Sequence, residues 1–236
     1  MIEPCKRLTF FACLLFAVIG SAFGQRAAVG IGAGETTDRF GALPSSSTAV
    51  GVVNADFIVI RANAKEQYPS IVAGGEIRFP ADTAKHASEF SAYAGPMFRF
   101  GTHLSLGFHA QVHKILLPAS VVDGQEFPRY NMLLLELPGV LEYKFSSAPN
   151  HAFFQAQVSP EFGPHFTAPK AGSSYPKPIL DHGYFFRGTL GYVVGKWYAK
   201  GTYESRYFKF SPTLGNPNLL DNWKTNYVMG GVGVVF

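Results

Sequence analysis

The chain has little charge and almost no cysteine. Of its 236 residues, 15% are Asp, Glu, Lys or Arg, and the formal net charge is only +4. The basic residues are dispersed, without the basic run or aromatic signature of a nucleic-acid-binding protein, so we expect no nucleic-acid partner. Both cysteines, Cys5 and Cys13, lie close to the N-terminus. The rest of the chain therefore has no thiol for a disulfide, a nucleophile or a thiolate metal site.

The first 24 residues are typical of a cleaved signal peptide. Lys6 and Arg7 precede an apolar run over residues 8–19, and Ala22-Phe23-Gly24 is a small-x-small cleavage site. The apolar run is shorter than the roughly 20 residues that a membrane-spanning helix needs. We therefore expect export through the Sec pathway, cleavage before residue 25, and one mature domain over residues 25–236.

Beyond this segment, apolar and polar residues alternate. Over residues 103–113 every second residue is apolar, and the same two-residue period recurs over 133–145, 154–162 and 197–210. This period is typical of β-strands, whose successive side chains point to opposite faces. The pattern predicts strands near residues 27–33, 50–61, 70–79, 89–100, 103–115, 131–145, 151–163, 183–194, 197–210 and 226–236.

The expected connections alternate in length. Short turns at 100–102, 146–150 and 195–196 are interleaved with longer segments at 34–49, 80–88, 116–130, 164–182 and 211–225. Short turns at one end and long loops at the other are typical of outer-membrane barrels. We predict an all-β fold, a closed antiparallel up-and-down transmembrane barrel of about ten strands. Eight is the nearest even alternative, because the strand near 50–61 is the weakest of the set.

The two faces of the predicted strands differ in kind. One face carries apolar residues, with aromatics near the strand ends that would form girdles at the membrane interfaces. These aromatics are Phe100, Tyr143, Phe145, Tyr184, Tyr192 and Tyr207. The other face mixes Gly, Ser, Gln and His with charges of both signs, as expected of a narrow lumen. A soluble lipocalin-like barrel would instead turn its apolar face inward.

The charged residues of the polar face are the candidate site. They could line an ion path or form a plug of salt bridges, and an interior this narrow favours a closed lumen filled by its own side chains. The predicted lumen network consists of Glu76, Arg78, Arg99, Glu136, Glu142, Glu161, Arg187, Glu204 and Arg206. Lys144 and Lys200 share this face.

Other candidate sites are weaker. His103, His109 and His113 share one strand face, but the first two would lie about 20 Å apart, too far to share a metal. The pair Asp181-His182 lies on the long-loop side, yet an isolated Asp-His dipeptide is more typical of a turn or a surface contact. We therefore predict no catalytic residues, no metal and no cofactor.

The last ten residues, 227–236, end on an aromatic, Phe236, after alternating valines. This ending resembles the closing strand of bacterial outer-membrane β-barrels, in the group of small OmpA-like barrel domains. The resemblance implies a location in the bacterial outer membrane, contact with its lipid and lipopolysaccharide, and recognition of Phe236 by the barrel assembly machinery. It implies very little about activity.

Three functions remain open at this point. The first is a non-enzymatic, monomeric surface barrel that acts structurally or binds through its long loops. The second is a narrow channel or a conduit for small or hydrophobic solutes, which would need an unfilled lumen or a lateral gap between strands. The third is an enzyme acting on lipid or peptide at the outer face.

Overall fold

A computed structural model describes residues 26–41, 44–60, 69–117, 120–122, 125–127, 131–167, 179–211 and 222–236. The predicted signal peptide therefore lies outside the described residues. Those residues form β1 (Arg26–Phe40), β2 (Ser46–Ile60), β3 (Ser70–Pro80), β4 (Ser88–Phe100), β5 (Leu104–Phe108), β6 (Ala110–Leu116), β7 (Ser120–Val122), β8 (Gln125–Phe127), β9 (Asn131–Glu136), β10 (Gly139–Lys144), β11 (His151–Thr167), β12 (Ile179–Val194), β13 (Trp197–Ser211) and β14 (Asn222–Val235). No helix among them is long and apolar enough to cross a membrane.

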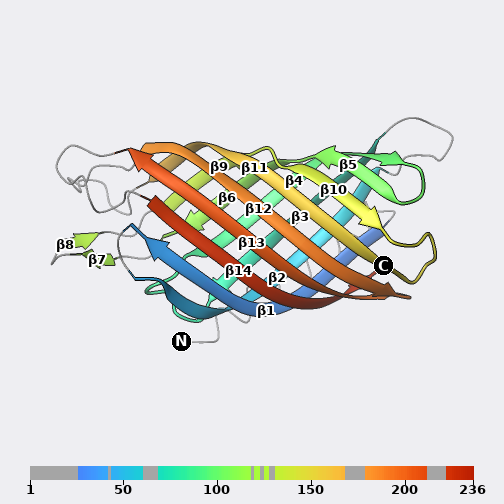
Figure 1. Cartoon of the computed structure of the whole chain (residues 1–236), viewed down its shortest axis with the longest axis horizontal. Helices are drawn as coiled ribbons and strands as arrows, with labels where there is room; N and C mark the ends of the chain where they lie inside the picture. The colour runs from blue at the N-terminus through green and yellow to red at the C-terminus, as the bar shows by residue number, and fades with distance from the viewer. Residues whose placement is uncertain are drawn as a thin grey trace.

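Twelve of these strands form one closed antiparallel barrel (Figure 1). Each strand pairs with its neighbours in chain order, and β1 pairs with β14 to close the circle. β5 and β6 together make one barrel strand, since both pair with β4, and β9 and β10 together make another, since both pair with β11. The barrel thus has ten strands in the described part of the chain. The predicted fold class is confirmed, including the strand near 50–61.

Proline explains one of the two interrupted strands. Pro138 stands between β9 and β10 and has no N–H to give to a neighbouring strand, so the ladder breaks there. The opposing residue, His109, lies between β5 and β6 and donates its own N–H to the carbonyl of Pro138 at 3.0 Å. The pairing therefore continues in the same register across the break.

The two ends of the barrel differ. At one end, called the turn end below, residues 61–69 join β2 to β3, and the short connections 101–103, 145–150 and 195–196 join the other strands. Gly101 and Gly195 take positive φ angles of 67° and 57° in two of these turns, a conformation that glycine adopts without steric cost. At the opposite, loop end, the hairpin β7–β8 stands beyond the barrel (Figure 1).

Several strands run further at the loop end than predicted. β1 extends to Phe40 where the pattern stopped at residue 33, so the expected long segment 34–49 shrinks to residues 41–45. Likewise β2, β12 and β14 begin at residues 46, 179 and 222, against predicted starts at 50, 183 and 226. These extensions carry polar residues on the outward face, such as Glu35 and Lys224, and therefore lack the apolar alternation that signals a strand in lipid.

The outer wall of the barrel is apolar. Large side chains that point outward and are exposed include Leu106, Phe108, Leu135, Val158, Phe186, Leu190, Val228 and Val232. The predicted aromatics also face outward, in two groups. Tyr143 meets Phe145 edge-on at 5.3 Å at the turn end, and Tyr184 stacks with Tyr207 at 5.5 Å at the loop end. The inner wall carries the polar side chains, as the sequence predicted.

Candidate functional site in the barrel lumen

The lumen holds three layers along the barrel axis. Next to the loop end is an apolar layer, built from Ala87, Ile115, Leu117, Met132, Leu134, Phe208, Phe210 and Trp223. A network of charged side chains follows, and next to the turn end lies an open cavity. The layers are called the apolar layer, the charge network and the lumen cavity.

Glu204 on β13 is the centre of the charge network. Its carboxylate is fully buried and accepts hydrogen bonds from three guanidinium groups. Arg78 binds both of its oxygens, at 2.7 and 2.6 Å, Arg187 donates through Nε at 2.6 Å, and Arg206 donates through Nε at 2.6 Å. Bidentate and charge-assisted bonds of this kind are the strong ones, and they hold all three arginines in fixed positions.

Arg206 carries the network to the other side of the barrel. Its Nη1 lies 2.6 Å from Glu136 on β9 and 3.1 Å from Glu161 on β11, and these two glutamates are direct cross-strand partners. The guanidinium also lies over the ring of Phe185, 4.6 Å from its centroid. One buried cation therefore neutralises two adjacent carboxylates that would otherwise repel each other.

Arg78 connects the opposite side. It pairs with Glu76 at 2.5 Å and with Glu89 at 3.2 Å, and it lies over the ring of Tyr227 at 4.4 Å. The hydroxyl of Tyr227 donates to Glu89 at 2.6 Å. His113 bridges the two halves, because its ring nitrogens lie 3.2 Å from Glu89 and 3.0 Å from Glu136.

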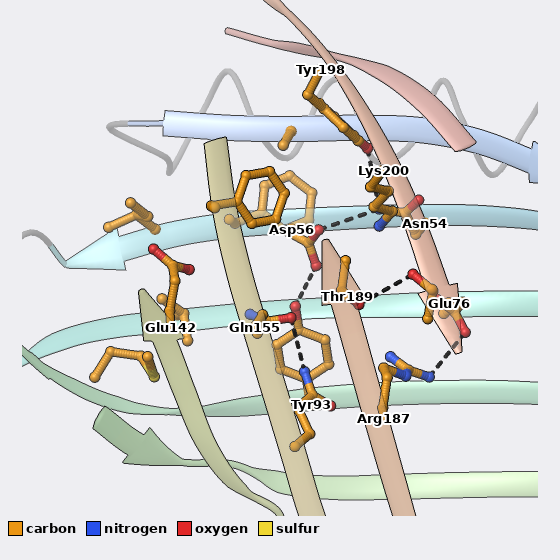
Figure 2. A pocket seen from close by; sticks show the side chains of 18 of the residues that line it. Asn54, Asp56, Glu76, Tyr93, Glu142, Gln155, Arg187, Thr189, Tyr198 and Lys200 are labelled. Atoms are coloured by element: carbon orange, nitrogen blue, oxygen red, sulfur yellow. Dashed lines mark hydrogen bonds and ion pairs between the residues drawn. The ribbon is translucent and has the colours of Figure 1, made fainter. Parts of the chain in front are cut away.

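These contacts cross the lumen. β3 and β12 lie halfway round the barrel from one another in the strand order, yet Arg187 on β12 reaches Glu76 on β3 at 3.1 Å (Figure 2). Arg78 on β3 and Glu204 on β13 are four strands apart and also touch. Side chains from opposite walls therefore meet inside the lumen at this level.

Most of the predicted network is found together. The members brought into contact are Glu76, Arg78, Glu136, Glu161, Arg187, Glu204 and Arg206. Two predicted members lie apart from the others. Arg99 is exposed near the turn end of β4, and Glu142 lies near the turn end of β10, where it pairs with Lys144 at 3.5 Å. Both face the lumen side of their strands but sit too far along the axis to reach the network.

Sequence reasoning also missed members of the network. Glu89, Tyr227, Gln111 and His113 all join it, Gln111 by donating to Glu136 at 2.5 Å. Glu89 has the same parity as Ser91 on a predicted strand, so its position on the polar face could have been read from the sequence. Its contact with Arg78 follows from the pairing of the neighbouring strand β3, whereas its contact with Tyr227, 138 residues away in the chain, has no signal in the sequence.

The apolar layer closes the loop end of the lumen. Trp223 is fully buried and stacks between Phe208, at 5.0 Å, and Phe40, at 5.6 Å. Its indole Nε1 donates to Asp38 at 3.2 Å, and Asp38 also pairs with His86 at 2.6 Å. The polar atoms of this layer are thus satisfied inside it, as buried polar groups require.

The lumen cavity occupies the turn-end half of the barrel and measures about 260 Å³. Figure 2 shows its wall, with side chains from several strands pointing into it. Its inner part is polar: Tyr93 donates to Asp56, and Asn54 donates to Asp56 at 3.2 Å. Lys200 also lines it, with its ammonium 5.6 Å from the ring of Tyr198.

The other candidates do not gather into a site. His109 and His113 face the lumen as predicted, and His103 binds the carbonyl of Lys144 at 2.7 Å. Among the described residues, no group of three or more His, Cys, Asp or Glu side chains could hold a metal ion. His182 and Asp181 are 3.0 Å apart and both exposed at the start of β12. Phe236 follows β14, is 70% exposed, and is fixed by its N–H to the carbonyl of Ala27 at 2.8 Å.

Comparisons with known proteins find only distantly similar structures. No family model matches the chain, and no curated protein matches it. Among solved structures, the transport unit of the autotransporter AIDA-I from Escherichia coli is 10% identical, with a TM-score of 0.49, and the match covers 94% of this chain and 95% of that one. The outer membrane protease OmpT from Escherichia coli is 10% identical, with a TM-score of 0.43, and the match covers 90% and 96%. The attachment invasion locus protein Ail of Yersinia pestis is 11% identical, with a TM-score of 0.35 and coverage of 90% and 99%.

Proposed function

We propose that this chain is an integral protein of the bacterial outer membrane with a closed, non-conducting lumen, and that it acts without catalysis, structurally or by binding at its loop end. The apolar outer wall supports the membrane location. Side chains such as Leu190 and Val228, each about 60% exposed, would be costly to hydrate in water and favour contact with lipid.

The two ends support an orientation. Outer-membrane barrels place short turns in the periplasm and longer loops outside the cell. By this rule the turn end faces the periplasm, and the loop end meets lipopolysaccharide and the surroundings of the cell. Phe236, which is exposed, lies at the turn end, and we propose that the periplasmic barrel assembly machinery contacts the barrel there. We propose a monomer, because the barrel closes on itself through β1 and β14 and leaves no sheet edge to pair with a second copy.

The closed lumen rests on one observation, the charge network that crosses it. A conducting pore of this strand number would need free space between its walls, yet Arg78, Arg187 and Arg206 converge on one carboxylate from three strands. The apolar layer adds a second barrier next to the loop end.

A second candidate function is a conduit for small or hydrophobic solutes. The lumen cavity favours it, because space for a solute exists in the turn-end half of the barrel. For a full passage, the charge network would have to rearrange, or the wall would have to open laterally.

Two sets of measurements test the proposal, one for the membrane barrel and one for the closed lumen. Purified mature protein in detergent should migrate differently on gels with and without boiling, give a β-type circular dichroism spectrum and fractionate with outer membranes. In planar bilayers the wild type should show no steady conductance. A variant with Arg206, Glu204 and Arg78 all changed to Ala removes the centre of the network with its charges, and serves as the open control if it still folds.

Either of two results would overturn this proposal. Protein that is soluble in the periplasm without detergent would reverse the assignment of the apolar face and indicate a lipocalin-like carrier. Steady wild-type conductance similar to that of the triple variant would refute the closed lumen and favour the conduit.

A further inference from the structure

We propose that the lumen cavity is a binding site for a small amphiphilic anion, with a carboxylate or phosphate head at Lys200 and an apolar tail at the turn-end mouth. This goes beyond the closed, non-catalytic barrel proposed above, because it assigns a ligand to the half of the lumen that the charge network leaves open.

The acidic groups of the cavity already have partners. The two oxygens of Asp56 accept hydrogen bonds from the hydroxyl of Tyr93 and the amide of Asn54. Glu76 pairs with Arg78 at 2.5 Å and with Arg187 at 3.1 Å. Glu142, the third acidic residue of the wall, pairs with Lys144 at 3.5 Å. A cationic ligand would therefore have to displace an existing interaction in order to reach any of the three carboxylates.

The unused capacity in the same wall belongs to donors. Arg187 is engaged by Glu76 and Glu204, but Lys200 has no carboxylate within ion-pair distance among the described residues. Its ammonium lies over the ring of Tyr198 at 5.6 Å, inside the cavity wall drawn in Figure 2. An ammonium carries three donors, and an anionic head placed against it would satisfy them and balance its charge.

Two further side chains of the cavity wall carry unpaired nitrogens. Gln155 accepts from Gln157 at 3.2 Å through its oxygen, which leaves its own amide hydrogens without an acceptor in the described part of the barrel. His109 is 3% exposed and stacks on Tyr93 at 4.6 Å, and its Nε2, which donates or accepts according to the ring tautomer, has no hydrogen-bond partner among the residues described. Because buried polar groups are normally satisfied, this buried nitrogen beside the cavity points to a polar ligand group.

Apolar side chains line part of the cavity near the turn end. Met97, Val193 and Val235 stand close to the turn-end limits of their strands, and Phe153 lies near the start of β11. Lys144 and His151 line the same part of the wall, so the apolar side chains form a patch beside polar groups. This combination suits a ligand with a polar head and an apolar tail.

The volume limits the size of the ligand. About 260 Å³ falls just below the range of about 300–1,000 Å³ usual for drug-sized ligands. A medium-chain carboxylate or a short alkyl phosphate fits this limit, whereas a whole phospholipid does not.

The test uses the full mature protein in lipid nanodiscs and isothermal titration calorimetry. The ligands are octanoate and octyl phosphate, with octanol, octyltrimethylammonium and acetate as controls for charge and tail. We expect saturable one-to-one binding of at least one of the two amphiphilic anions and none of the controls. Binding of octanoate alone would indicate a carboxylate source, and binding of both would indicate any amphiphilic anion of this size.

Two variants locate the site. Lys200→Gln should weaken binding at least tenfold, and Lys200→Arg should retain it. Lys144→Gln is the matched control, because Lys144 lines the same cavity but already pairs with Glu142. Each variant is first checked for the heat-sensitive folded band. Absence of saturable binding, equal binding of octyltrimethylammonium, or full binding by a folded Lys200→Gln protein would overturn the proposal.

Discussion

Replacing Arg206 by Met removes the one cation that holds Glu136 and Glu161 together. Met has a side chain of similar length without charge, so the change tests what the charge and hydrogen bonds of Arg206 contribute to stability. The guanidinium lies 2.6 Å from Glu136, 3.1 Å from Glu161 and 2.6 Å from Glu204, and it is 1% exposed. After the change, two cross-strand carboxylates would face each other without their shared counter-charge.

The expected cost follows from what remains. Glu204 keeps Arg78 and Arg187, and Glu136 keeps His113, so the loss falls mainly on Glu161. Breaking a buried pair by removing one partner costs about 3–5 kcal/mol, and we expect Arg206→Met to lie within this range. Adding Glu161→Gln removes one of the repelling charges. The double variant should therefore recover part of the loss, with a coupling of about 0.5–3 kcal/mol.

The measurement is urea unfolding in lipid vesicles, followed by tryptophan fluorescence, with the free energy of unfolding compared among variants. Arg99→Met is the matched control, because Arg99 faces the same side of the wall but is exposed and lies outside the network. It should change the free energy of unfolding by less than about 0.5 kcal/mol. If Arg206→Met costs no more than this control, or if Glu161→Gln makes the loss larger, the network does not stabilise the barrel in the way argued here.

Three further predictions test other parts of the barrel. Leu190→Arg, on the outer wall between Tyr184 and Tyr192, should lower the free energy of unfolding in vesicles by about 2–4 kcal/mol. Trp197→Arg, at the turn end, should lower it by about 0–1 kcal/mol. Equal costs for the two variants would contradict the membrane placement. The chain has two tryptophans, so brominated lipids should quench emission from the exposed Trp197 and spare the buried Trp223: Trp223→Phe should keep the quenching and Trp197→Phe should lose most of it. Pro138→Ala supplies the missing N–H opposite His109 and should slow hydrogen exchange of the His109 amide, and an unchanged exchange rate would show that the break does not weaken the ladder.

The strand count could be predicted because lipid imposes a strict rule on the outer wall. Wherever a strand crosses the apolar band, every second residue must be apolar, and that period is visible without knowing which strands pair. The limits of the strands could not be predicted in the same way. Over residues 35–38 of β1 the sequence is Glu-Thr-Thr-Asp, which looks like a loop, although Thr36 and Asp38 are buried inward-facing residues of a continuing strand.

The membership of the charge network shows a second limit. The alternation of residues along a strand identifies which side chains face the lumen. The height of each side chain along the barrel axis depends on the stagger between strands, which is fixed only by how the strands pair. Glu204 lies opposite Tyr227 and Arg187 in the register of its two neighbours, and this places three members of the network at one level. Arg99 and Glu142 occupy inward-facing positions of their strands, so the alternation in the sequence selects them. They lie at a different height along the barrel axis from the charge network.

The inner and outer walls exchange character toward the loop end, and this explains why both barrel types considered at the outset fit part of the sequence. On β13 the outward residues Ala199 and Tyr203 are followed by Lys209, whereas Phe208 and Phe210 turn inward. β14 repeats the change, with Trp223 buried inside and Lys224 exposed outside. A strand that leaves the lipid meets water on its outer face, so burial there favours apolar side chains inside, as in a soluble barrel. The apolar layer is then a core that does not depend on the membrane. It can fix the loop end rigidly above the charge network, as the proposed binding surface outside the cell would require.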